Sequence, residues 1–326
     1  MVNRLCAVAL ATLLLALALP QIAPRKSAAF IAEKRQAVLL AAAAREIIGE
    51  RLLGVEYSEI TTTIGHKDAK VLSAASDFPA LLVQWLKEAG VEKGDTVAIN
   101  ASGSFPALTI AALAAVKAAG AKPLLIASLG SSSWGANRPD FTWLHMEREL
   151  TARWPEFAGI AVSYGGDGDM AHDMSEQGRH ALRLAFDLTD APFLEHEDSA
   201  SAVSARIVLW TRRNGGKLPA ALINTGGNMA FWGTRERDPL RLEGLRMPGG
   251  AADGDGVGDV FLREGKPVIH LLGIRKMAAR YRITIPPSPD SPLWVTTDIS
   301  PLVRACVFLL LGGILTAIAR MRPRGM

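Results

Sequence analysis

Cysteine is almost absent from this chain of 326 residues. The two cysteines, Cys6 and Cys306, both lie in apolar segments near the ends, and the residues between those segments contain none. This absence excludes a disulfide, a thiolate metal site and a cysteine nucleophile from the central part of the chain. An exported domain without cysteine also avoids problems of oxidation.

Nucleotide-binding signatures are also missing. The sequence contains neither a Walker A motif nor the dinucleotide-binding pattern G-x-G-x-x-G. An exported domain would not meet ATP, so a kinase or a ligase is disfavoured on both grounds. Aromatic residues make up only 6% of the chain, while alanine is abundant, which favours helices.

Acidic residues are absent from both ends. Segments 1–26 and 304–326 hold seven of the 36 basic residues, which leaves 29 basic against 32 acidic residues between them. The sequence pI of about 9.2 is therefore a property of the ends. Nucleic acid is not expected as a partner, because binding it would need a basic face on the central domain.

The first apolar run covers residues 5–19 and is uncharged. Such a run is either the core of a cleaved signal peptide or an uncleaved signal anchor. Ala16 and Ala18 are small enough for a cleavage site, but Pro20 and Pro24 follow closely. We therefore predict an N-terminal signal anchor over residues 1–26.

The second apolar run is shorter than a full membrane span. Its uncharged part, residues 305–319, would cover about 22 Å as a helix, against a hydrocarbon core roughly 30 Å thick. It crosses only if Leu302 and Val303 join it and Arg304 extends toward the headgroups. The alternative is a buried core helix, but the terminal position favours a transmembrane helix with a basic tail over 304–326.

The charges around these runs predict the topology. Three arginines in the C-terminal tail indicate the cytoplasmic side, and Arg4 indicates the same for the N-terminus, although Arg25 and Lys26 oppose it. Both termini are then expected in the cytoplasm. The main domain is expected outside it, at the inner membrane of the cell.

Between the ends, short β-type runs alternate with amphipathic helices. Long helices are predicted over 28–53 and 68–89, forming a helical juxtamembrane region over 27–93. In a domain over 94–283, strands are predicted at 96–101, 123–128, 159–163, 220–224 and 267–272, with helices at 105–119, 140–153, 174–188 and 275–281. This alternation predicts an α/β fold with a mostly parallel sheet and helices on both faces. A flexible loop at 248–258 and a proline-rich connector at 284–303 complete the chain.

Ligands of open α/β sheets bind at the carboxyl ends of the strands, where this sequence is polar and rich in glycine. The first such segment contains Asn100, Ser102, Gly103 and Ser104. Ser104 suits the N-cap of the next helix, with Pro106 in its first turn. Amides and hydroxyls there form an anion cradle for a carboxylate or phosphate. Alternatively, Ser102 or Ser104 is a nucleophile, although the segment does not match G-x-S-x-G.

Two further segments follow predicted strands. The second consists of Asn224, Thr225, Gly226, Gly227 and Asn228. Because Asn224 and Asn100 each close a strand, we expect both segments to line one cleft, although an ordinary turn is the alternative. The third segment contains Ser131 and Ser132 as ligand-binding candidates, and Trp134 as a pocket wall or a cover for the core.

Metal ligation and histidine chemistry are only weakly indicated. Asp167, Asp169 and His172 are weak candidates for a divalent metal site, with a spacing that matches no known motif. Asp173 is a further oxygen donor or a helix cap. The other histidines have no partner spacing and are expected at the surface or at helix ends. These are His66, His145, His180, His196 and His270. The sequence leaves the cofactor, if there is one, open.

Three blocks of this sequence together resemble the bacterial poly-γ-glutamate system protein family. They are residues 100–108, residues 130–137 with 140–143, and residues 224–228, and the terminal anchors also fit. The resemblance covers most of the chain and implies an accessory role beside poly-γ-glutamate synthesis and export at the cell envelope. It implies the membrane, the polymer and its synthase subunits as partners, and it brings no catalytic residues.

Three functions are therefore compatible with the sequence. The first is an accessory envelope component that binds a carboxylate-rich ligand at the strand-end loops. The second is a serine-dependent hydrolase or transferase acting on γ-glutamyl amide bonds. The third is a non-catalytic membrane scaffold. Whether the protein is an enzyme stays open at this point.

Overall fold

The computed structural model divides the chain into two compact units. It describes residues 25–234, 242–250 and 252–297, with a few isolated positions in the apolar ends. One unit is Phe30–Leu293, and the other combines Met1–Ala29 with Trp294–Met326. Within the second unit, strand β1 (Arg25–Ser27) pairs antiparallel with β10 (Val295–Thr297).

The structure describes only a few residues of each predicted membrane anchor. Among all the described residues, no helix combines the length and the apolar character needed to cross a membrane. The predicted anchor cores, 5–19 and 305–319, lie almost wholly outside the described part of the chain. Anchoring at both ends therefore stays a prediction.

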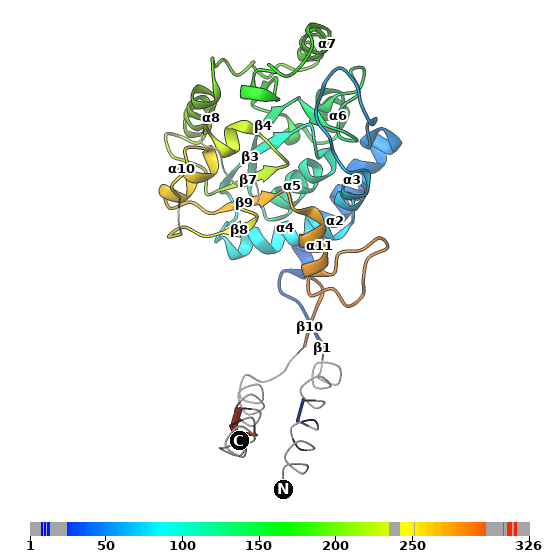
Figure 1. The fold of residues 1–326 in the computed structure, drawn as a ribbon, viewed down its shortest axis with the longest axis vertical. Helices are drawn as coiled ribbons and strands as arrows, with labels where there is room; N and C mark the ends of the chain where they lie inside the picture. Colours follow the sequence, from blue (N-terminus) through cyan, green and yellow to red (C-terminus); the bar gives the residue numbers. More distant parts are fainter. Residues whose placement is uncertain are drawn as a thin grey trace, which may run out of the picture. The chain divides into compact units, whose positions relative to one another are not determined.

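The larger unit contains a mostly parallel sheet, as predicted. Within the described residues it has six strands in the order β6-β4-β3-β7-β9-β8 (Figure 1). They are β3 (Thr96–Ser102), β4 (Lys122–Ser128), β6 (Ala161–Ser163), β7 (Ala221–Thr225), β8 (Gly244–Arg246) and β9 (Val268–Leu271). Only the edge strand β8 runs antiparallel to its neighbour. The chain builds outward from β3 through β4 to β6 and then returns to β7 on the other side of β3. This reversal creates a switch point between β3 and β7, where such sheets bind ligands.

Helices cover both faces of this sheet, which confirms the predicted layering. Successive residues of a strand point to opposite faces of the sheet. The last two residues of β7 therefore point toward helices on the two different faces. The Thr225 hydroxyl lies 2.9 Å from that of Thr109 in α5 (Pro106–Ala118). The preceding residue, Asn224, accepts from Asn100, which in turn accepts from Arg206 of α8 (Ser199–Arg213) on the other face.

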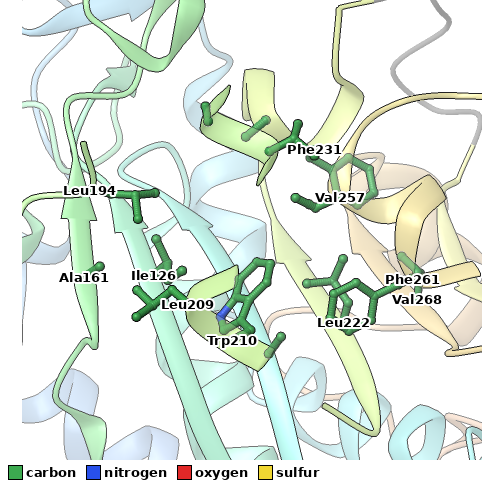
Figure 2. Close-up of a cluster of buried hydrophobic side chains, with 14 of the residues drawn as sticks. Ile126, Ala161, Leu194, Leu209, Trp210, Leu222, Phe231, Val257, Phe261 and Val268 are labelled. Carbon is green, nitrogen blue, oxygen red and sulfur yellow. The ribbon is translucent and has the colours of Figure 1, made fainter. Parts of the chain in front are cut away.

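An apolar cluster holds α8 and α10 (Val257–Arg263) against the second face (Figure 2). Trp210 meets Phe261 edge to face, with ring centroids 5.8 Å apart, and its indole N–H donates to the Leu124 carbonyl at 2.9 Å. Ile126 and Leu222 supply sheet side chains to the same cluster. The cluster therefore fixes the helix that carries Arg206. Neither α8 nor α10 is among the helices predicted from the sequence.

The predicted helix over 68–89 is wrong as a single element. The chain forms α3 (Lys67–Ser73), breaks at residues 74–76, and resumes as α4 (Asp77–Glu88). Pro79 explains the break, because in a continuous helix its ring would clash with the backbone carbonyl four residues earlier. In the first turn of a new helix, its missing N–H needs no partner.

The remaining predicted helices are present within a few residues of their expected bounds. They are α2 (Ile31–Ile48) with the 3₁₀ helix η1 (Gly49–Leu52), α6 (Trp143–Thr151), α7 (Glu176–Phe186) and α11 (Ile274–Tyr281). After α6 the chain forms the 3₁₀ helix η2 (Pro155–Phe157). Four short elements of the described unit lie next to the site. They are β2 (Thr61–Thr63), β5 (Ser131–Ser132), which pairs with β2, the 3₁₀ turn η3 (Asp167–Asp169) and α9 (Met229–Trp232).

Candidate functional site

A cavity of about 700 Å³ lies at the carboxyl ends of the parallel strands. Residues that follow β3, β4, β6, β7 and β9 all line it, together with the segment that leads from β2 into α3. It therefore occupies the switch point that the strand order creates. The predicted ligand-binding residues on its wall are Ser102, Ser104, Ser132, Gly227 and Asn228.

Asp167 and Asp173, considered above as metal ligands, also line the cavity, whereas the other predicted ligand-binding residues lie outside its wall. Asn100 and Asn224 sit opposite each other in register, with the Asn100 amide donating to Asn224 Oδ1 at 2.7 Å, but both are fully buried. Trp134 lies beneath the ammonium of Lys67, with 4.6 Å from Nζ to the ring centroid. Also outside the wall are Gly103, Ser131, Thr225 and Gly226. The aromatic residues that line the cavity are instead Phe105 and Trp232.

Ser104 is not the N-cap of α5, contrary to the prediction. That position belongs to Phe105, whose side chain makes no capping hydrogen bond, while Pro106 is the first helical residue as expected. The Ser104 hydroxyl accepts instead from the backbone N–H of Ser132, at 3.0 Å. The Ser102 hydroxyl donates to the Thr225 carbonyl at 3.2 Å. Both hydroxyls thus connect neighbouring strand-end loops.

Lys70 of α3 is a cavity residue that the sequence analysis missed. Its ammonium donates to Ser132 Oγ at 2.7 Å and to the Ser104 carbonyl, and it lies 3.5 Å from the centroid of the Phe105 ring. The side chain is only 3% exposed, and no described acidic residue forms an ion pair with it. Burial lowers the pKa of Lys70 to about 7, because the charged form loses its hydration.

Gly65 allows α3 to approach the serine loop this closely. A Cβ at this position would lie 2.6 Å from the Ser133 carbonyl oxygen and 3.2 Å from Ser132 Oγ. Contacts this short force a shift of the backbone or the neighbouring side chain, so a side chain here would push the two segments apart. A glycine at position 65 thus permits the contact between Lys70 and Ser132.

A buried polar network supports the cavity from the α8 face of the sheet. Arg206 Nη2 lies 2.7 Å from Asp169 Oδ2, and both side chains are fully buried. The hydroxyls of Ser128 and Ser163 each accept from Arg206 at 3.0 Å and donate to Asp169 Oδ1 at 2.9 Å. Asp169 Oδ2 accepts no hydrogen bond from any described group, so the ion pair with Arg206 compensates its burial.

This network reaches the cavity through Ser128. Ser128 lines the cavity, and its hydroxyl also accepts from the Asn228 amide at 2.6 Å. His196, which was expected at the surface or at a helix end, is buried, with Nε2 3.3 Å from Asp169 Oδ2. His270, expected likewise, is buried against Phe231, with ring centroids 4.3 Å apart. The strand-end loops are thus tied together by polar contacts on the side opposite α5.

The weak metal candidates do not converge. Asp169 is occupied by Arg206, whereas Asp167 and His172 are exposed and 4.0 Å apart at their closest side-chain atoms. Asp173 accepts from the backbone N–H of Asp167 at 2.8 Å, and Ser175 caps the next helix. Among the described residues, no group of three or more potential metal ligands is close enough to hold an ion.

Comparison with known proteins finds no matching family model, no matching curated protein and no matching solved structure. The resemblance to the poly-γ-glutamate family therefore stays a prediction. The geometry, however, connects its three blocks: Ser102 and Ser104, Ser132, and Asn228 come from different blocks and line one cavity.

Proposed function

We propose that the cavity binds a carboxylate-bearing ligand, and that the protein is a membrane-anchored accessory component of poly-γ-glutamate synthesis and export. The observation that carries the proposal is Lys70, a buried cation that lines the cavity and has only uncharged partners among the described residues. A carboxylate in the cavity would supply the missing negative charge at low dielectric, where an ion pair is strong.

The remaining wall carries two acidic and two basic residues, Asp167, Asp173, Arg275 and Lys276, and its uncharged part suits a γ-linked glutamate chain. Each such residue presents one carboxylate, one amide and two methylene groups. Hydroxyls of Ser102 and Ser104 and the amide of Asn228 offer polar contacts, while Phe105 and Trp232 offer apolar surface for the methylenes. A mixed wall of this kind is typical of sites that orient a small ligand with a few polar groups.

Calorimetry with the full chain in detergent tests this function. We expect γ-glutamyl oligomers to bind, and the Lys70→Met variant to bind them at least tenfold more weakly. Lys67→Met is the matched control, because it removes a positive charge from the same helix but outside the cavity. Absence of binding, or equal binding by both lysine variants and the wild type, would refute the proposal.

The pH dependence of binding gives a second test. With a pKa of about 7, Lys70 is mostly charged at about pH 6 and mostly neutral at about pH 8. Glutamate carboxylates stay ionised over this range. If the charged form alone binds, affinity falls by about tenfold between these two pH values. α-Linked glutamate oligomers of equal length show whether the γ-linkage matters.

A further inference from the structure

We propose that Ser132 is a nucleophile and Lys70 its general base, so that the cavity performs acyl transfer on an amide of a carboxylic acid. The inference rests on the proposed function for its substrate, a γ-glutamyl amide. Its covalent step stands on the geometry of the two side chains and is tested separately. It assigns the nucleophile to Ser132, whereas the sequence suggested Ser102 or Ser104.

The contacts of the four cavity serines, Ser102, Ser104, Ser128 and Ser132, distinguish Ser132 from the others. Ser132 Oγ lies 2.7 Å from Lys70 Nζ, within reach for direct proton transfer. Lys70 contacts Ser104 only through the backbone carbonyl, and the Ser102 hydroxyl donates to the carbonyl of Thr225. The Ser128 hydroxyl donates to Asp169, but that carboxylate is already paired with Arg206. Among the described residues, Ser132 is thus the cavity serine whose hydroxyl contacts an amine base.

The surroundings of Lys70 supply the neutral amine that a general base requires. Desolvation lowers the pKa of Lys70 to about 7, so about half of the molecules carry a free lone pair at neutral pH. In that form the lone pair accepts the Ser132 hydroxyl proton, while an amine N–H keeps its bond to the Ser104 carbonyl. The Ser132 backbone is held by its N–H bond to Ser104 Oγ, at 3.0 Å.

The reaction balances with one co-reactant, which is water in a hydrolase or a second amine in a transferase. As Ser132 Oγ bonds to the amide carbon, its proton moves to Lys70 Nζ. The carbon–nitrogen bond then breaks, and the Lys70 ammonium returns the proton to the leaving amine. The acyl group stays on Ser132 as an ester. Water cleaves this ester in a hydrolase, or a second amine takes the acyl group in a transferase.

A serine-reactive fluorophosphonate probe, applied to the full chain in detergent, tests the covalent step. The probe bonds to the nucleophilic oxygen and releases fluoride, and peptide mass spectrometry locates the modified serine. We expect labelling at Ser132 that rises with pH through about 7, as Lys70 loses its proton. Lys70→Met should slow labelling by at least a hundredfold, within the range for loss of a general base.

Variants of neighbouring serines serve as controls. Ser132→Ala should abolish labelling, while Ser133→Ala should label at the wild-type rate, because Ser133 is adjacent in sequence but does not line the cavity. Release of nitroaniline from γ-glutamyl p-nitroanilide, lost in Ser132→Ala and kept in Ser133→Ala, would extend the result to an amide.

The outcomes separate this inference from the proposed function. Labelling at Ser102 or Ser104, or no labelling of a chain that binds γ-glutamyl oligomers, overturns the nucleophile and leaves the binding function intact. Labelling at Ser132 without binding of γ-glutamyl oligomers supports the nucleophile and refutes the proposed ligand. Equal labelling of Lys70→Met and the wild type overturns the role of Lys70 as the base.

Discussion

Lys70 should destabilise the folded protein, and this cost can be measured by replacing it with methionine. Lys70→Met keeps an unbranched side chain of similar length but removes the buried charge. A pKa lowered from 10.5 to about 7 corresponds to about 5 kcal/mol of unfavourable burial when the ammonium is charged. Methionine loses the hydrogen bonds to Ser132 and the Ser104 carbonyl, which offsets about 1–3 kcal/mol. The variant should therefore be more stable than the wild type by about 2–4 kcal/mol near pH 6.

This gain should depend on pH in a defined direction. The unfolded chain keeps the Lys70 proton up to its ordinary pKa of 10.5, whereas the folded chain releases it near 7. Between these values the unfolded state binds more protons, so the stability of the wild type rises with pH. The methionine variant lacks this contribution. Its advantage is therefore full below about pH 7 and shrinks as the pH approaches about 10.

Urea denaturation of the full chain, followed by tryptophan fluorescence at several pH values, measures the difference. Using the difference between two variants cancels the titration of other groups. Lys67→Met, on the same helix but above the Trp134 ring, should show no comparable gain or pH dependence. A Lys70→Met variant that is less stable than the wild type near pH 6, or a gain independent of pH, would refute the claim that Lys70 is strained by burial.

Three further substitutions probe the support of the cavity. Arg206→Met leaves the Asp169 carboxylate buried without its ion pair and should lower the free energy of unfolding by about 3–5 kcal/mol in thermal denaturation. Stability should recover when Asp169 is also replaced by an apolar residue. A loss below about 1 kcal/mol would exclude this pairing. Gly65→Ala places a methyl group 2.6 Å from the Ser133 carbonyl and should cost about 1–3 kcal/mol while slowing probe labelling, and unchanged labelling would count against close packing there. The Asn137 side chain accepts from the backbone N–H of Val55 at 2.9 Å and donates to its carbonyl at 2.8 Å. Asn137→Ala removes both hydrogen bonds, so hydrogen exchange in residues 54–61 should accelerate. Unchanged exchange would show that Asn137 does not hold this segment.

The alternation of strands and helices was readable from local pattern. Each parallel strand is a short apolar run that ends in polar or glycine-rich sequence, which is why its position and the ligand-binding edge could be predicted together. Helix α8 was not predicted because its buried face is interrupted by Arg206, which lies between the apolar pairs Ala202–Val203 and Leu209–Trp210. A capping box formed by Asp198 and Ser201 marks its start, and this signal was available in the sequence.

The roles of single residues could not be predicted as well from the sequence. Ser104 has the residue type of an N-cap, yet its hydroxyl is used by Ser132, which is near only because β3 and β4 are neighbours. His196 and His270 have no informative spacing, and each is buried by partners from other strands or turns. A pattern in one segment cannot show which of several acceptable partners the fold will supply.

The sequence by itself determined the layered α/β architecture and the edge of the sheet at which polar loops gather, because both follow from periodicity and from the residues that end each strand. Only the tertiary structure decided which side chains meet there. Lys70 and Ser132 are 62 positions apart, and Arg206 lies 78 positions from Ser128. Such pairs depend on strand order and on the packing of α3 and α8, and burial then changes the chemistry: the same lysine at the surface would keep its ordinary pKa and would be neither a strained cation nor a base.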